Sequence, residues 1–547
     1  MKQLFVLLCI FSFLFGCKTK PSETAKKTTT EAHPFVWEAA NVYFMLTDRF
    51  NDGNEANNLN YDRTKEPATL RGFMGGDMAG ITQKIKEGYF DNLGVNAIWF
   101  SPVLEQIHDS TDEGTGNTYA FHGYWTKDWT QFDANFGTAA DFAALMETAH
   151  EHGIRILMDV VMNHTGPVTE KDPVWDNNWV RTGPGCTYKD QDSAVSCTLV
   201  ENLPDILTNS NEVVSLPTPL VEKWKAEGRY EAEMKELEDF FKKTGLEKTP
   251  KNYIIKWLTD YVREYGVDGY RVDTVKHVEE EAWNSLNAQA QIAFTDWKTA
   301  NPDAVLDDTA FFMLGELYGY GIDNKRFYDF GDTKVDYYAN GFDNLINFQF
   351  KYDARGDYES IFSKYDRILH TDLKGKSVMN YISSHDDGDP FDKARTKPYE
   401  SATKLLLTPG ISQIYYGDET KRPLIIEGTT GDATLRSFMN WDMMNDADTK
   451  KLLTHWQKLG QFRKVHPAIG AGTHKMISES PYIFSRTYNS DKVVVGLDLP
   501  KGKKEISVDK QFVDGETVTD HYSGKTATVS NGKVTIDSEF SIVLLHQ

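Results

Sequence analysis

The chain has 547 residues, of which 40% are hydrophobic and 13% aromatic, so it is long enough for several domains with large cores. The formal net charge is −22 and no basic stripe is present, which argues against a nucleic-acid partner. The aromatic content fits stacking on sugar rings, although a large core has the same composition.

The N-terminus has the pattern of an export signal. Lys2 precedes the apolar run LFVLLCIFSFLFG, which is too short to span a bilayer and is followed by Cys17 and a polar segment. The residues LFGC resemble a bacterial lipobox, although Phe15 is bulkier than the usual occupant and cleavage without lipidation is an alternative. We predict a lipoprotein signal at 1–16, lipidation of Cys17 and a polar tether at 17–33. The chain is then an exported bacterial lipoprotein at the periplasmic or cell-surface side of the outer membrane.

Short apolar runs then alternate with helical patterns such as those at 138–153 and 252–266. Strands are expected within 41–50, 94–103, 153–164, 266–277, 311–317, 376–387 and 411–419, with one more near 334–344. Alternating strands and helices predict a parallel sheet, and eight strands predict an α/β fold of the (β/α)8 TIM-barrel type. Polar residues follow the carboxyl end of each strand, which is the face where such barrels build active sites.

Two further domains are expected around this barrel, which spans 34–465 as domain A. An inserted domain B follows the third strand at about 165–250, and its part at 221–245 reads as one charged, solvated helix. After residue 465 only strand patterns occur, which predicts a C-terminal antiparallel β-sandwich at 466–547. Cys186 and Cys197 lie in the insert, and two close cysteines of an exported protein most simply form a disulfide. A zinc site would need further ligands nearby, and none is evident.

The segment 268–277, DGYRVDTVKH, ends an apolar strand with charged residues. Arg271 and Asp273 are two residues apart, so on a strand they share one face. A buried arginine and aspartate must satisfy one another or meet a ligand. In isolation such a motif is most simply a structural ion pair.

Five motifs decide between these readings. DVVMNH, LPDI, GYRVDTVKH, GE and SSHDD begin at residues 159, 203, 269, 315 and 383. With FMGGDMAGI, HGYW and YYGDE they resemble the α-amylase family, glycoside hydrolase family 13, over about 34–470. The resemblance implies a retaining glycosidase that hydrolyses α-1,4-glucosidic bonds of starch-type α-glucans through a covalent glycosyl–aspartate intermediate.

The same resemblance assigns the reacting groups. Asp273 would be the nucleophile, Glu316 the general acid and base, and Asp386 the group that holds the distorted sugar. Retention needs two carboxyl groups about 5 Å apart, and adjacent strand ends supply that spacing. Arg271 would orient Asp273 and favour its charged form. The implied sugar contacts are His122, Tyr124, His164, Arg271, Lys276, His277 and His385. Ser384 stands where the family commonly has Asn, and we expect only a local change of hydrogen bonding there.

One or two Ca²⁺ ions are expected as cofactors. The segment 48–58, with the later GGD, is similar to the corresponding stretch of cyclodextrin glucanotransferases and is rich in the short oxygen ligands that calcium prefers. The ligands this likeness implies are Asp52, Asn54, Asn57, Asn58, Gly75 through its carbonyl, and Asp77. A second site, shared across much of the family, would use Asn163, Asp205 and the carbonyl of His277.

The motifs alone do not say whether water or another sugar captures the intermediate. Glu201 stands where cyclising enzymes carry an aromatic residue, and no further starch-binding modules follow the β domain, so cyclisation is disfavoured. A cyclomaltodextrinase- or neopullulanase-type hydrolase and a 4-α-glucanotransferase remain alternatives. A non-catalytic glycan-binding surface protein is disfavoured because all three carboxylates are present. We expect a monomer whose partner is an α-glucan and whose only membrane contact is the lipid anchor.

Overall fold

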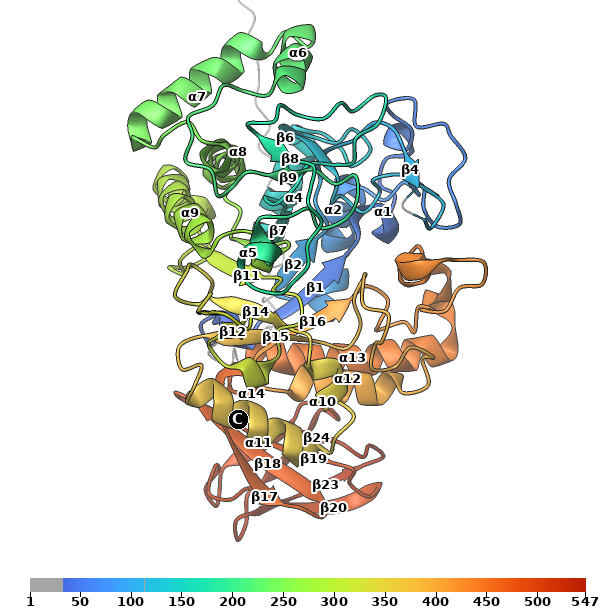
Figure 1. Ribbon diagram of the computed structural model, residues 1–547. Helices are drawn as coiled ribbons and strands as arrows, with labels where there is room; N and C mark the ends of the chain where they lie inside the picture. Colours follow the sequence, from blue (N-terminus) through green and yellow to red (C-terminus); the bar gives the residue numbers. More distant parts are fainter. Residues whose placement is uncertain (1–32, 113) are drawn as a thin grey trace, which may run out of the picture.

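The computed structural model describes residues 33–112 and 114–547 (Figure 1). The predicted signal peptide, the lipidation site at Cys17 and nearly all of the tether lie outside the described residues. Within the described ranges, no helix is both long and apolar enough to cross a membrane.

Eight parallel strands close into a barrel at the centre of the molecule. In chain order they are β1 (Asn41–Met45), β2 (Ala97–Phe100), β7 (Arg155–Val160), β10 (Gly269–Val272), β11 (Phe312–Gly315), β14 (Asn344–Asn347), β15 (Ser377–Tyr381) and β16 (Ile411–Tyr415). Each strand pairs with its neighbours in this order, and β16 pairs with β1 to close the ring. The predicted α/β barrel is therefore confirmed.

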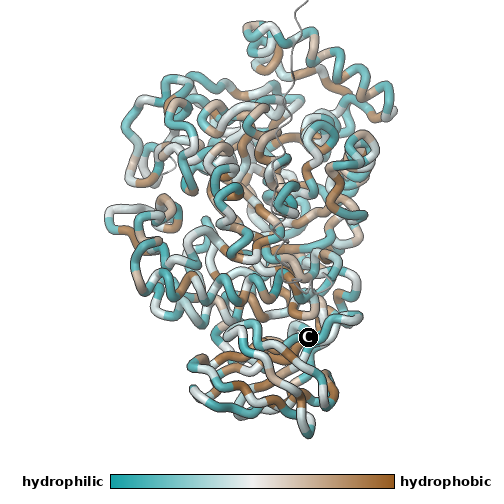
Figure 2. Tube along the Cα trace, turned by 180° about the vertical axis from the view of Figure 1, so that it is seen from behind, coloured by the Kyte–Doolittle hydropathy of each residue, from teal (hydrophilic) through white to brown (hydrophobic). Residues whose placement is uncertain are grey.

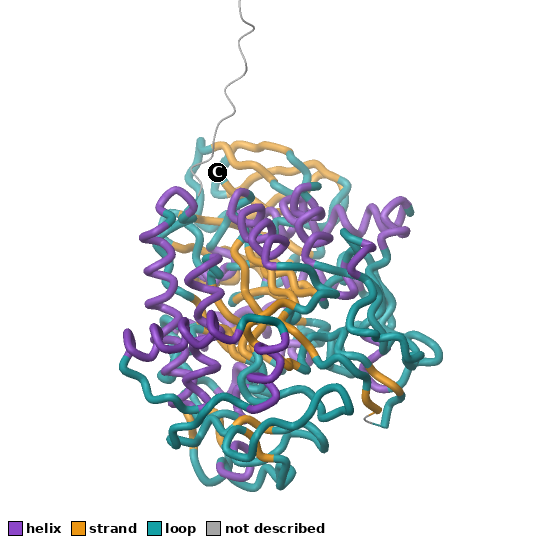
Figure 3. Tube along the Cα trace, turned by 90° about the horizontal axis from the view of Figure 1, so that it is seen from above, coloured by secondary structure: helices purple, strands orange, loops and turns teal. Residues whose placement is uncertain are grey.

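Helices surround the strands, as the view from above shows (Figure 3). The principal ones are α2 (Met78–Lys86), α4 (Ala139–Glu151), α8 (Pro250–Tyr265), α9 (Glu280–Ala300), α11 (Tyr358–His370), α12 (Pro398–Leu407) and α13 (Ala447–Val465), with short α3 (Tyr89–Asn92) and α10 (Phe350–Asp353). Local chemistry sets their ends. Thr138 and Asp141 form a capping box at the start of α4, and α8 begins at Pro250 and ends at the left-handed Gly266.

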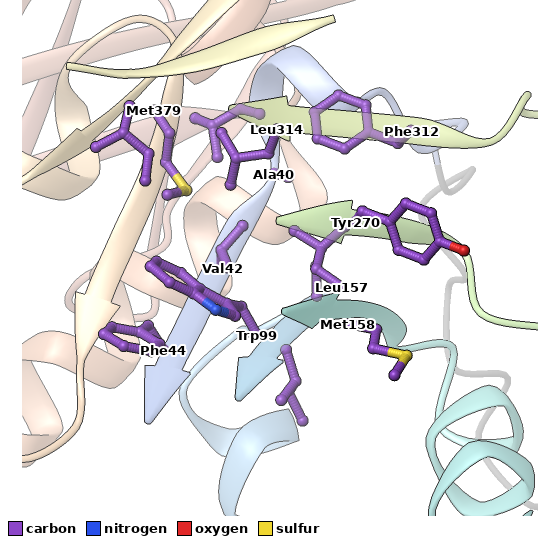
Figure 4. Close-up of a cluster of buried hydrophobic side chains, with 14 of the residues drawn as sticks. Ala40, Val42, Phe44, Trp99, Leu157, Met158, Tyr270, Phe312, Leu314 and Met379 are labelled. Atoms are coloured by element: carbon purple, nitrogen blue, oxygen red, sulfur yellow. The ribbon is translucent and has the colours of Figure 1, made fainter. Parts of the chain in front are cut away.

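Because helices cover the barrel, its strands are buried on both faces, and every residue of β7 is buried. Figure 4 shows side chains of β1, β2, β7, β10, β11 and β15 packed together in this core. Phe44 stacks on Trp99 with ring centroids 3.6 Å apart. The Trp99 indole then donates a hydrogen bond of 2.9 Å to Asp159, so the apolar core leads directly into a charged layer at the strand ends.

The sixth barrel strand begins only at the last residue of the segment 334–344, where it was expected, and runs to Asn347. Residues Lys334–Val335 instead form β13, which pairs with β12 (Tyr328–Asp329) in a small hairpin. The chain turns at Asp336, whose carbonyl accepts from the amide of Ala339, and the run in which every residue is buried is Asn344–Asn347.

The segment between β7 and α8 forms an insertion over the barrel. It holds β8 (Val180–Arg181), α5 (Asp192–Val195), β9 (Asp205–Ile206), α6 (Thr218–Ala226) and α7 (Tyr230–Thr244). The expectation of one charged helix here is wrong, because the chain breaks at the left-handed Gly228 and makes two helices. Both protrude beside α8 (Figure 1), and α7 buries Leu237, Phe240 and Phe241.

The C-terminal part is antiparallel. It contains β17 (Thr473–Ser478), β18 (Tyr482–Tyr488), β19 (Asp491–Leu497), β20 (Gly502–Ser507), β21 (Thr517–Asp520), β22 (Lys525–Thr528), β23 (Lys533–Ser538) and β24 (Val543–His546). One sheet has the order β17-β18-β19-β24-β21-β22, and β20 pairs with β23. Buried and exposed residues alternate along β23, as expected when one face packs inward, whereas β19 is buried almost throughout; Figure 2 shows hydrophobic and hydrophilic segments side by side in this part of the chain.

Candidate active site

Two carboxylates stand at the same level on adjacent strands. Val272 of β10 pairs with Gly315 of β11, and the next residues are Asp273 and Glu316. The Asp273 amide donates to the Val160 carbonyl at 3.0 Å, and the Glu316 amide donates to the Val272 carbonyl at 2.8 Å. The ladder of the barrel therefore fixes both backbones, and both side chains project at the carboxyl ends of the strands.

The local sequence explains how these ends are shaped. A β-carbon at Gly315 would lie 2.9 Å from Phe342 and from Leu345, so a glycine must precede Glu316. Thr274 has a φ of 49°, which is uncommon for a β-branched residue. This turn aims the Thr274 amide at Glu316 Oε2, 2.8 Å away. The left-handed conformation thus supplies a hydrogen bond to the second carboxyl group.

Arg271 links the charged groups of the centre. Its guanidinium lies 2.7 Å from Asp273 Oδ1, 3.3 Å from Glu316 Oε2 and 3.0 Å from Asp159 Oδ1. Burial disfavours its charge, but Asp159, Tyr124, Glu316 and Asp273 together raise its pKa well above the usual value. Arg271 therefore stays charged, and it holds both carboxylates beside one cation.

The two carboxylates experience different surroundings. Burial raises the pKa of Glu316 to about 8, with Arg271 opposing the rise and with Asp273 and Asp386 adding to it. Glu316 therefore carries a proton at neutral pH. Asp273 instead makes the shortest contact with the arginine. Two neighbouring carboxyl groups separated in this way can serve as an acid and a nucleophile.

Asp386 completes the predicted trio, beyond the end of β15. The hydroxyl of Ser384 donates to Asp386 Oδ1 at 2.9 Å. Burial tends to raise the pKa of Asp386, but His385, Arg436 and Arg271 lower it by more. Ser384 thus provides a direct hydrogen bond at the position where Asn was expected from the family pattern, and Asp386 stays ionised.

Tyr124 lies among the predicted sugar contacts. Its hydroxyl donates to Asp159 at 2.9 Å, and its ring stacks on His385 with centroids 5.4 Å apart. The His122 ring centroid lies 5.8 Å from that of Tyr124, and His164 hydrogen-bonds to the Tyr124 carbonyl. Burial lowers the pKa values of all three histidines, so they act as neutral rings. The structure brings these four predicted residues together around the carboxylates.

Lys276 marks the other end of the site, together with two exposed tyrosines that sequence reasoning missed. Its ammonium lies 5.1 Å from the ring centroid of Tyr188 and 5.0 Å from that of Tyr318. We call Tyr188, Lys276 and Tyr318 the aromatic clamp. Tyr318 follows Glu316 by two residues, a spacing visible in the sequence, whereas nothing in the sequence places Tyr188 opposite it.

The predicted disulfide between Cys186 and Cys197 is confirmed, with Cα atoms 4.9 Å apart. The loop that it closes contains Tyr188 and α5, and the carbonyl of Ala194 lies 2.8 Å from Nδ1 of His277. Burial lowers the pKa of His277 to about 4. The disulfide loop therefore holds both Tyr188 and His277 at the rim of the site.

The first predicted calcium site gathers its ligands around the start of α2. Asp77 caps this helix by accepting from the Gly80 amide, and the Asn57 amide nitrogen donates to it at 2.9 Å. The Asn58 amide nitrogen donates to Asp52 at 2.7 Å. The side-chain oxygens of Asn57 and Asn58 are buried without a partner. These oxygens, with two carboxylates, fit a calcium ion.

Two other predicted ligands differ in how they lie at this site. A β-carbon at Gly75 would lie 2.8 Å from Asp52, so Gly75 belongs to the cluster. Asn54 is exposed, and its side-chain oxygen already accepts from the Ala56 amide. Of the predicted ligands it is therefore the one that least needs an ion.

The second predicted calcium site also fits an ion. The Asn163 side-chain oxygen lies 3.1 Å from the Asp205 carboxylate and 2.9 Å from the His277 carbonyl. Without an ion, turning the amide would let its nitrogen donate to both. Burial raises the pKa of Asp205 to about 8, which only the contact with Arg181 opposes. Three acceptor oxygens from β7's end, the insert and the β10 side thus converge where a cation would satisfy them.

A cavity of about 360 Å³ opens beside these groups, lined by Asp386, Tyr318, Phe348 and Tyr352 among others. It provides room for a sugar next to the carboxylates. A buried acid–nucleophile pair, an arginine between its members and an aromatic platform, at the strand ends of a (β/α)8 barrel, define a glycoside hydrolase.

The family model for the alpha-amylase catalytic domain matches residues 44–460 of the sequence. The chain therefore belongs to the alpha-amylase family. The periplasmic alpha-amylase of Escherichia coli (strain K12) is 37% identical over 534 residues, covering 86% of this chain and 73% of that protein. A cyclomaltodextrin glucanotransferase of Thermoanaerobacterium thermosulfurigenes is 27% identical over 517 residues, and the chain spans 64% of its length. The predicted family and enzyme class are therefore confirmed.

Solved structures agree on the fold. An Anoxybacillus alpha-amylase superposes with a TM-score of 0.63 at 24% identity, covering 94% of this chain and 99% of that one. A three-domain cyclomaltodextrin glucanotransferase, CldA, gives a TM-score of 0.61 at 21% identity and covers 92% of this chain. The same three-part architecture thus occurs in proteins named for hydrolysis and in proteins named for transfer.

Proposed function

We propose that the protein is an α-amylase-type retaining glycosidase that hydrolyses α-1,4-glucosidic bonds of starch-type glucans. The observation that carries this proposal is the position of Arg271, which contacts both Asp273 and the protonated Glu316. The likeness to a periplasmic alpha-amylase supports the choice of substrate.

The reaction follows from the two roles. Asp273 attacks the anomeric carbon and forms a glycosyl ester while Glu316 gives its proton to the glycosidic oxygen, so the leaving chain departs with a new hydroxyl group. Glu316, now ionised, takes a proton from water as the water oxygen attacks the same carbon. The ester bond to Asp273 breaks, the sugar is released with its original configuration, and Glu316 is again protonated.

The remaining residues bind and orient the sugar. Tyr124 offers a ring face at the cleavage point, while His122, His164 and His385 offer neutral hydrogen-bonding groups. The ionised Asp386 accepts hydroxyl protons of the distorted ring and, as an anion, helps keep the proton on Glu316. In this proposal Lys276 and His277 contact the leaving chain, and the aromatic clamp around Lys276 would flank it.

Calcium is part of the proposal as a structural ion. Asp52, Asn57, Asn58 and Asp77, with Gly75 and Asn54 beside them, would hold one ion against α2. Asn163, Asp205 and the His277 carbonyl would hold another and connect the insert to the barrel. A bound ion supplies positive charge that offsets converging oxygens and fixes the loops around the site.

We also propose that the protein is exported and anchored through Cys17. The sequence pattern at 1–17 supports this, and so does the likeness to a protein named as periplasmic. Metabolic labelling with a fatty-acid analogue tests it. Label should enter the wild-type chain but not the Cys17→Ser variant, and equal labelling of both would reject the anchor.

A second candidate function is glucan transfer. The aromatic clamp that flanks the leaving chain would equally hold an incoming sugar, and CldA, with the same three-part fold, is named as a transferase. Domain number therefore does not separate hydrolysis from transfer. Glu201, at the position where cyclising enzymes carry an aromatic residue, favours hydrolysis.

A product time course tests the proposal. Purified protein lacking residues 1–17 is given soluble starch, pullulan and β-cyclodextrin in parallel, with calcium. We expect a rapid loss of starch viscosity and mixed linear maltooligosaccharides. Preferential cleavage of β-cyclodextrin or pullulan would assign the enzyme to the cyclomaltodextrinase or neopullulanase type, and no turnover by folded protein would contradict the proposal.

A further inference from the structure

A second, larger cavity lies where the barrel meets the C-terminal sheet. Its volume is about 650 Å³, against about 360 Å³ for the cavity beside Asp386. Tyr399 and Glu400 of α12 line it on the barrel side, and Asp498, Glu539 and Phe540 line it from the loops after β19 and β23. We call this cavity the junction groove. None of its lining residues belongs to the reacting centre.

The junction groove presents open aromatic rings. Tyr399 is 46% exposed and Phe540 is 40% exposed, although both lie at the junction of two packed domains. The pyranose ring of a sugar has apolar C–H faces, and these pack against aromatic ring faces with favourable electrostatics. Two open rings, one from each domain, thus offer a sugar-sized platform.

Buried residues behind these rings hold them in place. The buried His455 contacts the Tyr399 carbonyl at 3.1 Å and the Tyr522 hydroxyl at 2.7 Å. Tyr522 in turn packs edge-to-face on Phe540 with centroids 5.1 Å apart, and Lys458 donates to the Tyr522 carbonyl. A platform fixed in this way loses little conformational freedom when a ligand binds.

Carboxylates outnumber ammonium groups in the lining of the groove, which holds Asp357, Glu400, Asp498 and Glu539 together with Lys404 and Lys501. Glu400, Asp498 and Glu539 contribute carboxylates, and Glu400 is half-buried in contact with Lys404 at 2.7 Å. Sugar hydroxyls donate to carboxylates, whereas this negative lining would repel a phosphorylated or otherwise anionic ligand. Aromatic platforms with acceptor groups therefore favour a neutral, polyhydroxylated ligand.

A comparable groove elsewhere lacks these features. A cavity of about 500 Å³ is lined by Glu233, Asp260 and Tyr261, so it too combines carboxylates with aromatic residues. There, however, Tyr261 is only 6% exposed, and Trp257 is buried completely. Its other rings, Tyr61, Phe132 and Tyr265, are only partly exposed, so it offers a sugar less open ring surface than the junction groove does.

The junction groove lies close along the chain to the catalytic cleft. Lys351 and the exposed Tyr352 line the cavity beside Asp386, whereas Tyr358 lines the junction groove. Lys404 of α12 donates to the carbonyls of Ala354 and Gly356, which fixes the short segment between the two cavities. A polymer held at the junction groove would therefore remain beside the catalytic cleft.

We propose that the junction groove is a second binding site for α-glucan, which retains polymeric substrate next to the catalytic cleft. This inference rests on the proposed function for the identity of the ligand. Two linked sites raise the apparent affinity for a polymer because the second contact is intramolecular. A short oligosaccharide that fills only the cleft gains nothing from the junction groove.

Binding to soluble starch by affinity electrophoresis tests this with four proteins, all carrying Asp273→Asn to prevent turnover. They are the parent, a cleft variant (Tyr124→Ala), a groove variant (Tyr399→Ala with Phe540→Ala) and their combination. Losing one aromatic contact weakens binding roughly two- to tenfold, so we expect each change to reduce retardation and the combination to abolish it. Groove variants that bind starch like their parents, with and without Tyr124, would overturn the inference.

Two controls keep the result interpretable. Phe327 is 50% exposed and lies outside the junction groove, so Phe327→Ala should leave starch retardation unchanged. If the double groove variant is unstable, Asp498→Asn with Glu539→Gln alters only exposed rim groups and should also weaken binding. Unchanged starch affinity in this rim variant as well would reject the site.

Activity separates this inference from the proposed function. In the catalytically competent chain, the groove variant should raise the KM for starch several-fold while kcat/KM for a maltotrioside chromogenic substrate stays within twofold. If the unmodified enzyme hydrolyses neither substrate, the proposed function fails. If it hydrolyses both and the groove variant matches it on both, only the second site fails.

Discussion

The reacting centre and the aromatic clamp show two ways of building one site. Arg271, Asp273 and Glu316 are buried, and their backbones are fixed by the barrel ladder. The clamp is assembled from loops, with Tyr188 and Tyr318 exposed on either side of Lys276. Under the proposed function, the groups that transfer the proton and form the covalent bond stand on strands, whereas contacts with the variable parts of the substrate would come from loops.

This difference predicts different costs of change. At the reacting centre, one atom decides whether a covalent bond can form. At the clamp, each ring adds one contact among several. The predictions below run from the first kind of effect to the second.

The largest effect should come from Asp273→Asn, which keeps the shape of the side chain but removes the nucleophilic charge. We expect kcat on maltooligosaccharides to fall by about 10⁴-fold or more. The melting temperature should change little, because the amide still contacts Arg271. A variant with ordinary turnover would show that the reacting centre has been assigned to the wrong residue.

Removing calcium should have the next largest effect, because it releases the loops that hold the clamp. At a calcium concentration about 100-fold above Kd, binding stabilises the fold by about 2.7 kcal/mol, or roughly 2–3 °C in Tm for a chain of this length. Chelation should therefore lower the Tm by about that amount for each occupied site. Asp205→Asn should remove the contribution of its own site and leave that of Asp77, and an unchanged melting curve of metal-free protein would contradict both sites.

The pH profile of kcat/KM should reveal the proton on Glu316. This group must be protonated to act as the acid, and its pKa of about 8 keeps it so through neutral pH. Activity should therefore fall as pH rises through about 8. Asp386→Asn removes a negative charge that raises this pKa, so it should lower the rate and move the alkaline limb to lower pH. If the alkaline limb of the profile stays at the same pH, Asp386 does not influence the pKa of Glu316.

The smallest effect should come from the clamp. Tyr188→Ala and Tyr318→Ala should each raise the KM for maltoheptaose roughly two- to tenfold with little change in kcat, because each removes one aromatic contact. Tyr188→Phe and Tyr318→Phe keep the rings and serve as controls. A loss of kcat comparable to that of Asp273→Asn would place the clamp within the reacting centre and remove the distinction drawn above.

The strand ends could be predicted from the sequence because they combine two signals. An apolar run that ends in Arg271 and Asp273 marks a buried strand whose last residues must find partners. Glu316 and Asp386 were assigned instead through the motifs GE and SSHDD, which carry the resemblance to the α-amylase family. The pairing of Val272 with Gly315, which sets both carboxylates at one level, follows from adjacent parallel strands.

Loops and long-range contacts could not be predicted in this way. Nothing local places Tyr188 against Lys276, because the loop closed by the Cys186–Cys197 disulfide, far upstream of Lys276, must first fold back on the barrel. The sixth strand lies later than its hydrophobic pattern suggested, because β12 and β13 form a hairpin. The junction groove joins α12 to the loops that hold Asp498 and Phe540, far later in the chain, so no motif could mark it.

The most direct test of the central assignment is to trap the glycosyl–enzyme intermediate. The Glu316→Gln variant is incubated with α-maltosyl fluoride, whose leaving group departs without an acid, so the ester forms but is slowly hydrolysed. The assignment predicts a maltosyl mass increase on the proteolytic peptide that contains Asp273, and none in the variant that also carries Asp273→Asn. A maltosyl adduct on any other residue, or release of the β-anomer without an adduct, would contradict it.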